Sequence, residues 1–161
     1  MFRTILRETL ALILFAGIIA ASLYGLFRWA PVGAESWYSG LRKPFWTPNL
    51  QIARTAWAVV WGLSAVAAWL VWLRRGPRAR VGVPLVWFFA QFALTLAWCG
   101  VFFFWNKPEY ALAAAALVWL SILASVVSFS NISTLAALLM TPALLWFGYT
   151  CALNFTIWRW N

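Results

Sequence analysis

Residues 110–158 decide the fold: they read YALAAAALVWLSILASVVSFSNISTLAALLMTPALLWFGYTCALNFTIW and contain no charged side chain. Because about 20 residues cross the hydrocarbon core of a bilayer as a helix, this run is long enough for two crossings. Its polar break, residues 129–134, is the expected position of the turn between them. The carboxyl end of the chain is therefore predicted to form two adjacent membrane-spanning helices.

Three earlier runs, residues 9–27, 55–73 and 81–106, are also uncharged. Overall 65% of the residues are hydrophobic and 9% are charged, against roughly 25% charged residues in soluble domains. A β-barrel is disfavoured because the runs do not alternate polar and apolar residues. We predict an all-α membrane protein, a single five-helix domain of residues 1–161. Its spans are expected at about 6–27, 52–73, 81–104, 109–128 and 134–158, with a long lid loop at 28–51.

The formal charge of +9 does not indicate a nucleic-acid partner, because the basic residues lie at the ends of apolar spans, where they anchor helices at lipid headgroups. If the spans alternate, both ends of the bundle carry equal numbers of Lys and Arg, which leaves the orientation open. The dense basic turn at 74–80 weakly favours a cytoplasmic position for the end of the bundle that carries this turn. We expect an integral, multi-pass protein, placed in a bacterial cell membrane by default.

Several kinds of chemistry are disfavoured by composition. The chain has no histidine, the commonest metal ligand and haem axial ligand. Its acidic residues, Glu8, Glu35 and Glu109, lie near span ends, whereas a proton-coupled pump keeps an ionisable group at mid-membrane. Cys99 and Cys151 fall inside spans, as buried thiols do. We predict no metal site and no tightly bound cofactor.

The first span has two interpretations. Its basic start and the small residues at 20–22 resemble a secretory signal peptide. Gly17, Ala21 and Gly25, however, recur one turn apart and form the kind of small-residue stripe that lets membrane helices approach closely. We favour a retained packing helix, with the signal peptide as the alternative.

The first loop is long for a connection between helices, which is typical of a lid or binding loop. Residues 34–41 are expected to form one or two turns of amphipathic helix, and Pro44 and Pro48 then fix the backbone. The alternative is an interfacial belt, where Trp and Tyr commonly lie.

Helical spacing brings aromatic and polar side chains onto inward faces. Trp57 and Trp61 lie one turn apart, and Thr95 and Trp98 share a stripe that begins at Gln91. Together these inward side chains would form an aromatic pocket that suits a flat, apolar ligand. Each tryptophan singly also fits a lipid-facing or packing role. The bundle is predicted to present Trp57, Trp61, Thr95, Trp98, Trp146 and Asn154 inward, beneath the loop that contains Trp37 and Trp46.

Three motifs occur in order over residues 37–161. They are Trp37-Tyr38-x-x-Leu41-x-Lys43-Pro44-x-Trp46-x-Pro48, then Gln91-x-x-x-x-x-x-Trp98-x-x-x-Phe102-Phe103, and Pro142-x-x-x-Trp146 followed by Leu153-Asn154-x-x-x-Trp158-Arg159-x-Asn161. This pattern resembles the tryptophan-rich sensory protein family, also called the translocator protein or peripheral benzodiazepine receptor family.

The resemblance implies a five-helix membrane protein, commonly a homodimer, that binds porphyrins such as protoporphyrin IX and haem. Some members also bind cholesterol and benzodiazepine-type ligands. By matching positions, Trp57 and Trp146 would be the pocket tryptophans, Asn154 would be a polar contributor, and the lid would hold Trp37, Tyr38, Trp46 and Pro48. The predicted ligand-binding residues are therefore Trp37, Tyr38, Trp46, Pro48, Trp57, Trp61, Thr95, Trp98, Phe102, Trp146 and Asn154. We therefore expect a receptor or translocator-like protein for porphyrin handling, transport or stress sensing. The alternatives are a light-dependent porphyrin-degrading enzyme with Trp57 and Trp146 as electron donors, a sterol or other hydrophobic-ligand binder, and a structural role.

Some positions depart from the family pattern. Asn49 replaces the second proline of the lid motif, Thr95 replaces an asparagine, and Ala143 replaces a tyrosine. Phe155 stands where the sterol-recognition pattern has tyrosine, and that pattern is weak even when complete. We expect altered polar contacts to ligand, and sterol binding is less expected than porphyrin binding.

Overall fold

The computed structural model describes residues 2–30, 36–76 and 80–161. Its long helices are α1 (Phe2–Trp29), α3 (Leu50–Leu73), α4 (Gly82–Cys99), α5 (Pro108–Ser130) and α6 (Thr134–Trp160). A single turn, α2 (Trp37–Gly40), lies in the first loop, and a π-helical turn, η1 (Gly100–Phe104), continues α4. Five spans are long and apolar enough to cross a membrane, which confirms the predicted all-α membrane protein.

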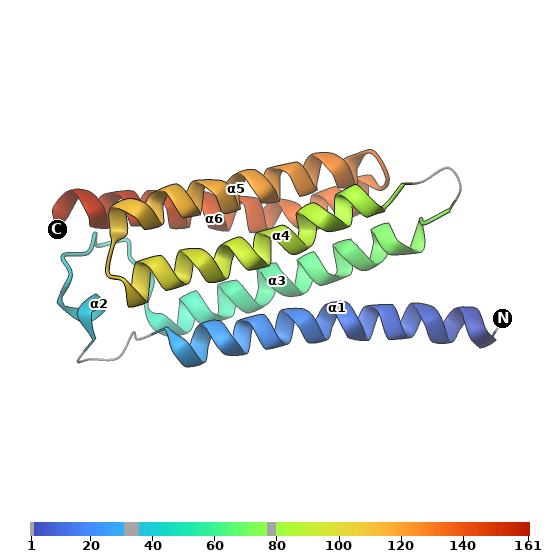
Figure 1. Cartoon of the computed structure of the whole chain (residues 1–161), viewed down its shortest axis with the longest axis horizontal. Coiled ribbons are helices and arrows are strands. Elements are labelled where there is room, and N and C mark those ends of the chain that lie inside the picture. Colours follow the sequence, from blue (N-terminus) through green and yellow to red (C-terminus); the bar gives the residue numbers. More distant parts are fainter. Residues whose placement is uncertain (1, 31–35, 77–79) are drawn as a thin grey trace.

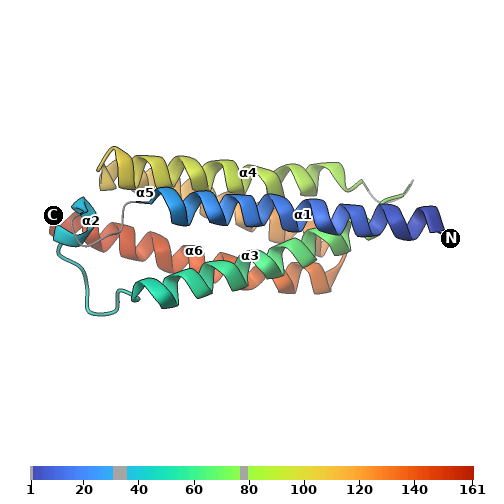
Figure 2. The ribbon, with the colours of Figure 1, turned by 90° about the horizontal axis from the view of Figure 1, so that it is seen from below.

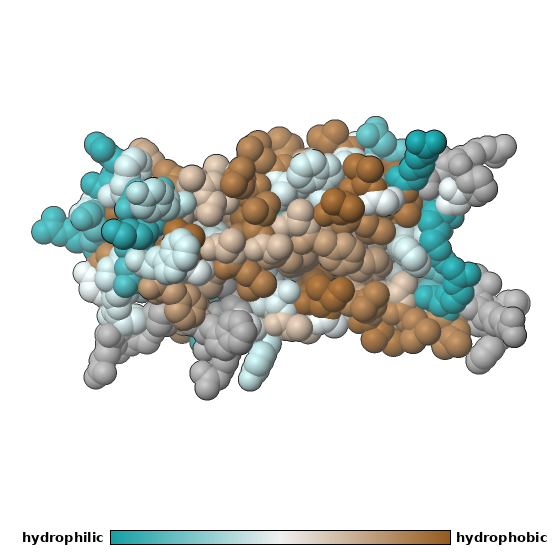
Figure 3. Space-filling view, in the orientation of Figure 1, coloured by the Kyte–Doolittle hydropathy of each residue, from teal (hydrophilic) through white to brown (hydrophobic). Residues whose placement is uncertain are grey.

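The long helices run along one axis of the molecule (Figure 1). The amino terminus and the α3–α4 connection lie at one end, and the carboxyl terminus, α2 and the α4–α5 connection lie at the other (Figures 1 and 2). Helix α5 packs against α4 and α6, and α3 packs against α6 and α1. Figure 3 shows hydrophobic side chains over the middle of one face and hydrophilic ones at both ends, as a bilayer requires.

Large aromatic side chains fill the space between α3, α4 and α6. The rings of Trp61 and Phe92 have centroids 5.0 Å apart, and those of Trp57 and Phe147 are 5.5 Å apart. The predicted stripe on α4 and η1, from Gln91 to Phe102, is buried. Aromatic packing therefore joins α3 to both α4 and α6.

Helix α1 is attached along its buried row of Ala11, Phe15 and Ile19. Phe15 contacts the rings of Trp72 on α3 and Phe88 on α4, with centroids 6.4 and 6.1 Å apart. This helix is therefore part of the bundle.

The ends of α1 and α3 are also joined by polar groups. Arg75 Nη2 lies 2.6 Å from the carboxylate of Glu8, and the indole N–H of Trp69 donates to the Glu8 carbonyl at 3.1 Å. The face that carries the small-residue stripe is open in the single chain, because Gly17 and Ala21 are exposed and a Cβ on Gly17 would meet nothing within 4 Å. Close helix packing through this stripe stays a prediction.

Local chemistry explains where the helices begin. The side chain of Asn49 accepts a hydrogen bond from the N–H of Ile52 at 2.8 Å and caps α3. Ser133 caps α6 in the same way, by accepting from the N–H of Ala136 at 3.3 Å. The predicted turn at 129–134 is therefore observed, and α5 runs slightly past its predicted end at residue 128.

Within the predicted lid helix at 34–41, the structure describes one turn, Trp37–Gly40. Residues 34 and 35 lie outside the described part of the chain.

Candidate ligand-binding site

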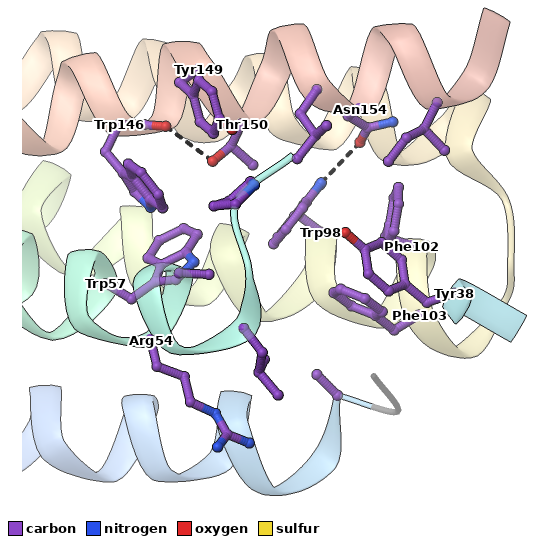
Figure 4. A pocket seen from close by; sticks show the side chains of 16 residues that line it. Tyr38, Arg54, Trp57, Trp98, Phe102, Phe103, Trp146, Tyr149, Thr150 and Asn154 are labelled. Carbon is purple, nitrogen blue, oxygen red and sulfur yellow. Dashed lines mark hydrogen bonds between the residues drawn. The ribbon is translucent and has the colours of Figure 1, made fainter. Parts of the chain in front are cut away.

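A cavity of about 170 Å³ lies under the lid at the carboxyl-terminal end of the bundle. Figure 4 shows the side chains around it, which come from α3, α4, η1, α6 and the first loop. The described lining residues are Ala30, Tyr38, Pro48, Leu50, Ala53, Arg54, Trp57, Trp98, Phe102, Phe103, Trp146, Tyr149, Thr150, Leu153, Asn154 and Ile157.

Three tryptophans from three helices form one wall of the cavity. Trp57 of α3 meets Trp146 of α6 edge to face, with centroids 6.1 Å apart and planes at 89°. Its ring lies 6.4 Å from that of Trp98 of α4, at 33°. These rings present both faces and edges to the space, which suits a flat conjugated molecule.

Asn154 is 2% exposed, and its amide is used within the protein. Its side-chain N–H donates to the carbonyl of Pro108 at 2.9 Å, and its oxygen accepts from the indole N–H of Trp98 at 3.1 Å (Figure 4). Asn154 therefore ties α6 to α4 and α5 and orients Trp98. Pairing explains how an amide is tolerated at this depth.

Trp146, a residue of the cavity lining, carries a hydrogen-bond donor that is unpaired in the described part of the chain. Its indole nitrogen is buried and has no partner among the described residues, whereas its carbonyl accepts from the hydroxyl of Thr150 at 3.0 Å. The ring stacks on Tyr149 with centroids 5.2 Å apart. A ligand acceptor beside Trp146 would satisfy this N–H.

The lid closes the cavity with aromatic contacts. The ring of Tyr38 packs on Phe102 and Phe103, with centroids 6.1 and 5.6 Å away, and Trp37 packs on Phe102 at 5.7 Å. Lys43 Nζ lies 4.6 Å from the centre of the Tyr38 ring. Burial, reinforced by the neighbouring Tyr149, raises the pKa of the Tyr38 hydroxyl, so the lid presents a neutral phenol.

Two hydrogen-bonded tethers hold the lid on α6. The N–H of Arg42 donates to the Asn161 side chain at 3.0 Å, and the Asn161 amide donates back to the Arg42 carbonyl at 3.1 Å. Farther along the lid, the Tyr149 hydroxyl donates to the Trp46 carbonyl at 2.7 Å. Asn161 and Tyr149 therefore act as the lid tethers.

The π-helical turn η1 places two consecutive aromatic residues beside the cavity. The N–H of Trp105 donates to the carbonyl of Gly100 at 3.1 Å, the wide turn typical of a π-bulge. Phe102 and Phe103 both line the cavity, with centroids 4.8 Å apart. The residue types of η1 do not predict this π-helical turn.

Seven predicted ligand-binding residues line the cavity, namely Tyr38, Pro48, Trp57, Trp98, Phe102, Trp146 and Asn154. The other four lie outside its lining. Trp37 packs on Phe102, Trp46 packs on Tyr149 at 5.4 Å, and Trp61 lies one turn farther along α3. The hydroxyl of Thr95 donates to the Gln91 carbonyl at 2.6 Å. Whether any of the eleven binds ligand stays a prediction.

Several lining residues were not predicted. Leu153 and Ile157 continue the one-turn spacing from Trp146, and Ala53 and Arg54 precede Trp57 by about one turn, so helical periodicity alone would have found them.

The four residues that depart from the family pattern are not part of the described cavity lining. Asn49 caps α3, Thr95 bonds within α4, and Ala143 is 4% exposed. Phe155 is 49% exposed and is not part of the described cavity lining.

Within the described part of the chain, no three His, Cys, Asp or Glu side chains gather. The cavity lining itself offers aromatic and apolar surface and a few hydrogen-bonding groups.

The chain is similar to known proteins along most of its length. Residues 9–159 match the sequence profile of the TspO/MBR family. The chain is 34% identical over 126 residues to the human translocator protein, covering 78% of this chain and 75% of that one. It is 32% identical over 127 residues to the tryptophan-rich sensory protein of Cereibacter sphaeroides, covering 79% and 78%. It is 29% identical over 155 residues to the tryptophan-rich protein TspO of Chlorobaculum tepidum, covering 96% and 98%.

Proposed function

The chain belongs to the TspO/MBR family, as its motifs predicted, and on this premise we propose that it binds tetrapyrroles such as protoporphyrin IX and haem. It is an integral membrane protein with an aromatic-rich core. The observation that carries the proposal is the meeting of Trp57, Trp98 and Trp146 around one cavity under the lid. The names of its relatives, translocator and sensory protein, fit a role in transport or sensing.

Binding would be driven mainly by burial of the apolar macrocycle, at roughly 25 cal/mol for each Å² removed from water. Stacking on the three tryptophans would orient the ring. The indole N–H of Trp146, unpaired among the described residues, would donate to an acceptor on the ligand. The ligand is held reversibly, with no covalent step.

The lid has to move for a tetrapyrrole to enter. The cavity of about 170 Å³ is smaller than the roughly 300–1,000 Å³ of ligand pockets in general. The tethers through Asn161 and Tyr149 must therefore lengthen or open as the macrocycle enters. Opening of the lid would therefore be the step that controls uptake or signalling.

A second candidate function is light- and oxygen-dependent breakdown of the bound porphyrin. The ring centroids of Trp57 and Trp146 lie 6.1 Å apart. This proximity favours the degradation function, because both indoles would lie beside the excited macrocycle as electron donors. The porphyrin itself would supply the photochemistry.

The test is a titration of purified protein with protoporphyrin IX in the dark, followed by tryptophan fluorescence and porphyrin absorption. Wild-type protein should show saturable binding. The double variant Trp57→Phe with Trp146→Phe should bind about tenfold more weakly, a loss of roughly 1.4 kcal/mol. Trp87→Phe is the matched control, because Trp87 is 42% exposed on α4 and outside the cavity lining.

Absence of saturation, or equal binding by the double variant and wild type, would sink the tetrapyrrole proposal. Illumination of the same samples separates the second candidate. A new spectral product that forms with wild type and is lost in the double variant supports degradation, whereas bleaching identical to that of free porphyrin rejects it.

A further inference from the structure

One charged side chain lies at the edge of the cavity. Among the described residues of the lining, Arg54 alone carries a formal charge, and no acidic side chain is present. It precedes Trp57 by three residues on α3 and therefore shares a helix face with that tryptophan. Arg54 therefore adds a positive charge at the edge of the cavity.

The position of Arg54 suits contact with the polar edge of a ligand. Figure 4 shows its side chain extending from α3 toward the end of α1, on the opposite side of Trp57 from Trp146. Arg54 is exposed at this end of the bundle. A molecule stacked beside Trp57 can keep its apolar body among the tryptophans and direct an edge toward Arg54.

Guanidinium groups pair well with carboxylates, because their planar N–H donors match the two carboxylate oxygens. The amino-terminal turn of α3, which begins beside Arg54 at Leu50, adds a weaker positive potential on the same side. A carboxylate held here also stays near the aqueous boundary and out of the hydrocarbon, where a charge is costly.

We propose that Arg54 makes the site selective for flat apolar ligands that carry a carboxylate. This inference rests on the proposed function and deepens it by naming a ligand class. Tetrapyrroles with propionate side chains at one edge meet the requirement, whereas their esterified forms keep the ring and lose the charge. Arg54 should discriminate between these two forms, and the tryptophans should not.

The experiment compares protoporphyrin IX with its dimethyl ester in titrations of wild type, Arg54→Gln, Arg54→Lys and Arg159→Gln. The last variant is the control, because it removes an exposed charge from the same end of the molecule but outside the described lining. Arg54→Gln should weaken binding of the free acid about tenfold and change binding of the ester less than twofold. Arg54→Lys should restore most of the loss, and Arg159→Gln should leave both ligands unaffected. Raising the salt concentration should shrink the difference between acid and ester in wild type.

The inference is overturned if Arg54→Gln weakens both ligands equally, weakens neither, or has the same effect as Arg159→Gln. These results are distinguishable from failure of the proposed function, in which wild-type protein binds neither ligand saturably. Because Arg54 is exposed, folding of its variants should be normal, and circular dichroism checks this.

Discussion

Asn154 shows how a polar residue in a membrane span acquires its role. Its spacing from Trp146 indicated an inward position, and the structure places it at the cavity. Its amide, however, pairs with Trp98 and Pro108. Sequence periodicity reveals which face a residue occupies, but it does not reveal which neighbour will take its hydrogen bonds.

Replacing Asn154 with leucine should destabilise the protein by about 2 kcal/mol, because the indole N–H of Trp98 would be buried without its acceptor. Unfolding in detergent, followed by circular dichroism, measures this. Asn131→Leu is the control, since Asn131 is exposed in the α5–α6 connection. Equal stability of the two variants would contradict the structural role assigned to Asn154.

Asn49 stands where the family pattern has a proline. The motif alone did not predict that this residue caps α3. As a cap, its side chain satisfies the N–H of Ile52 at the start of α3. Asn49→Ala should therefore cost about 1 kcal/mol of stability, and Asn49→Asp should retain most of it. Chemical denaturation of both variants provides the measurement. A loss equal for alanine and aspartate would show that Asn49 does not act through its side-chain oxygen.

For Arg54, the sequence pattern pointed to membrane anchoring and did not reveal a position beside the cavity. A basic residue at the start of a span is typical of membrane anchoring, so its charge was assigned to the headgroups. The structure adds that Arg54 borders the cavity while its side chain stays exposed.

At the scale of elements, the aromatic faces of α3, α4 and α6 were predictable, because helical spacing places Trp57, Trp98 and Trp146 inward. The turn η1 was not, since a π-bulge depends on the packing around it and has no residue signature. The contacts of α1 within the chain were not predictable either: they are made by the bulky Phe15, whereas the face at Gly17 stays open.

The lid is the element whose behaviour bears most on function. Asn161→Ala and Tyr149→Phe each remove one tether and should speed the association of protoporphyrin IX several-fold, because the lid opens more often. Stopped-flow quenching of tryptophan fluorescence measures the rate. Thr156→Ala serves as the control, since Thr156 bonds only to the Ala152 carbonyl of its own helix among the hydrogen bonds described. Unchanged rates in both tether variants would show that the lid does not limit entry.

At the scale of the whole molecule, the number of spans and the fold class follow from the uncharged runs, because the bilayer permits little else. The helices begin and end within a few residues of the predicted spans. Which helices neighbour one another does not follow, since every span is apolar on most faces. The homodimer implied by the family stays a prediction, and Gly17 lies on a face of α1 left open in the single chain.

If ligand occupies the cavity between α3, α4 and α6, a bulky side chain that fills this cavity should block binding. Ala53 lines the space, whereas Ala152 is exposed on α6, outside the described lining. Ala53→Phe should weaken protoporphyrin IX binding at least tenfold in a dark titration, while Ala152→Phe, with matched thermal stability, should bind as wild type does. Wild-type affinity in a folded Ala53→Phe protein would contradict the assignment of the site.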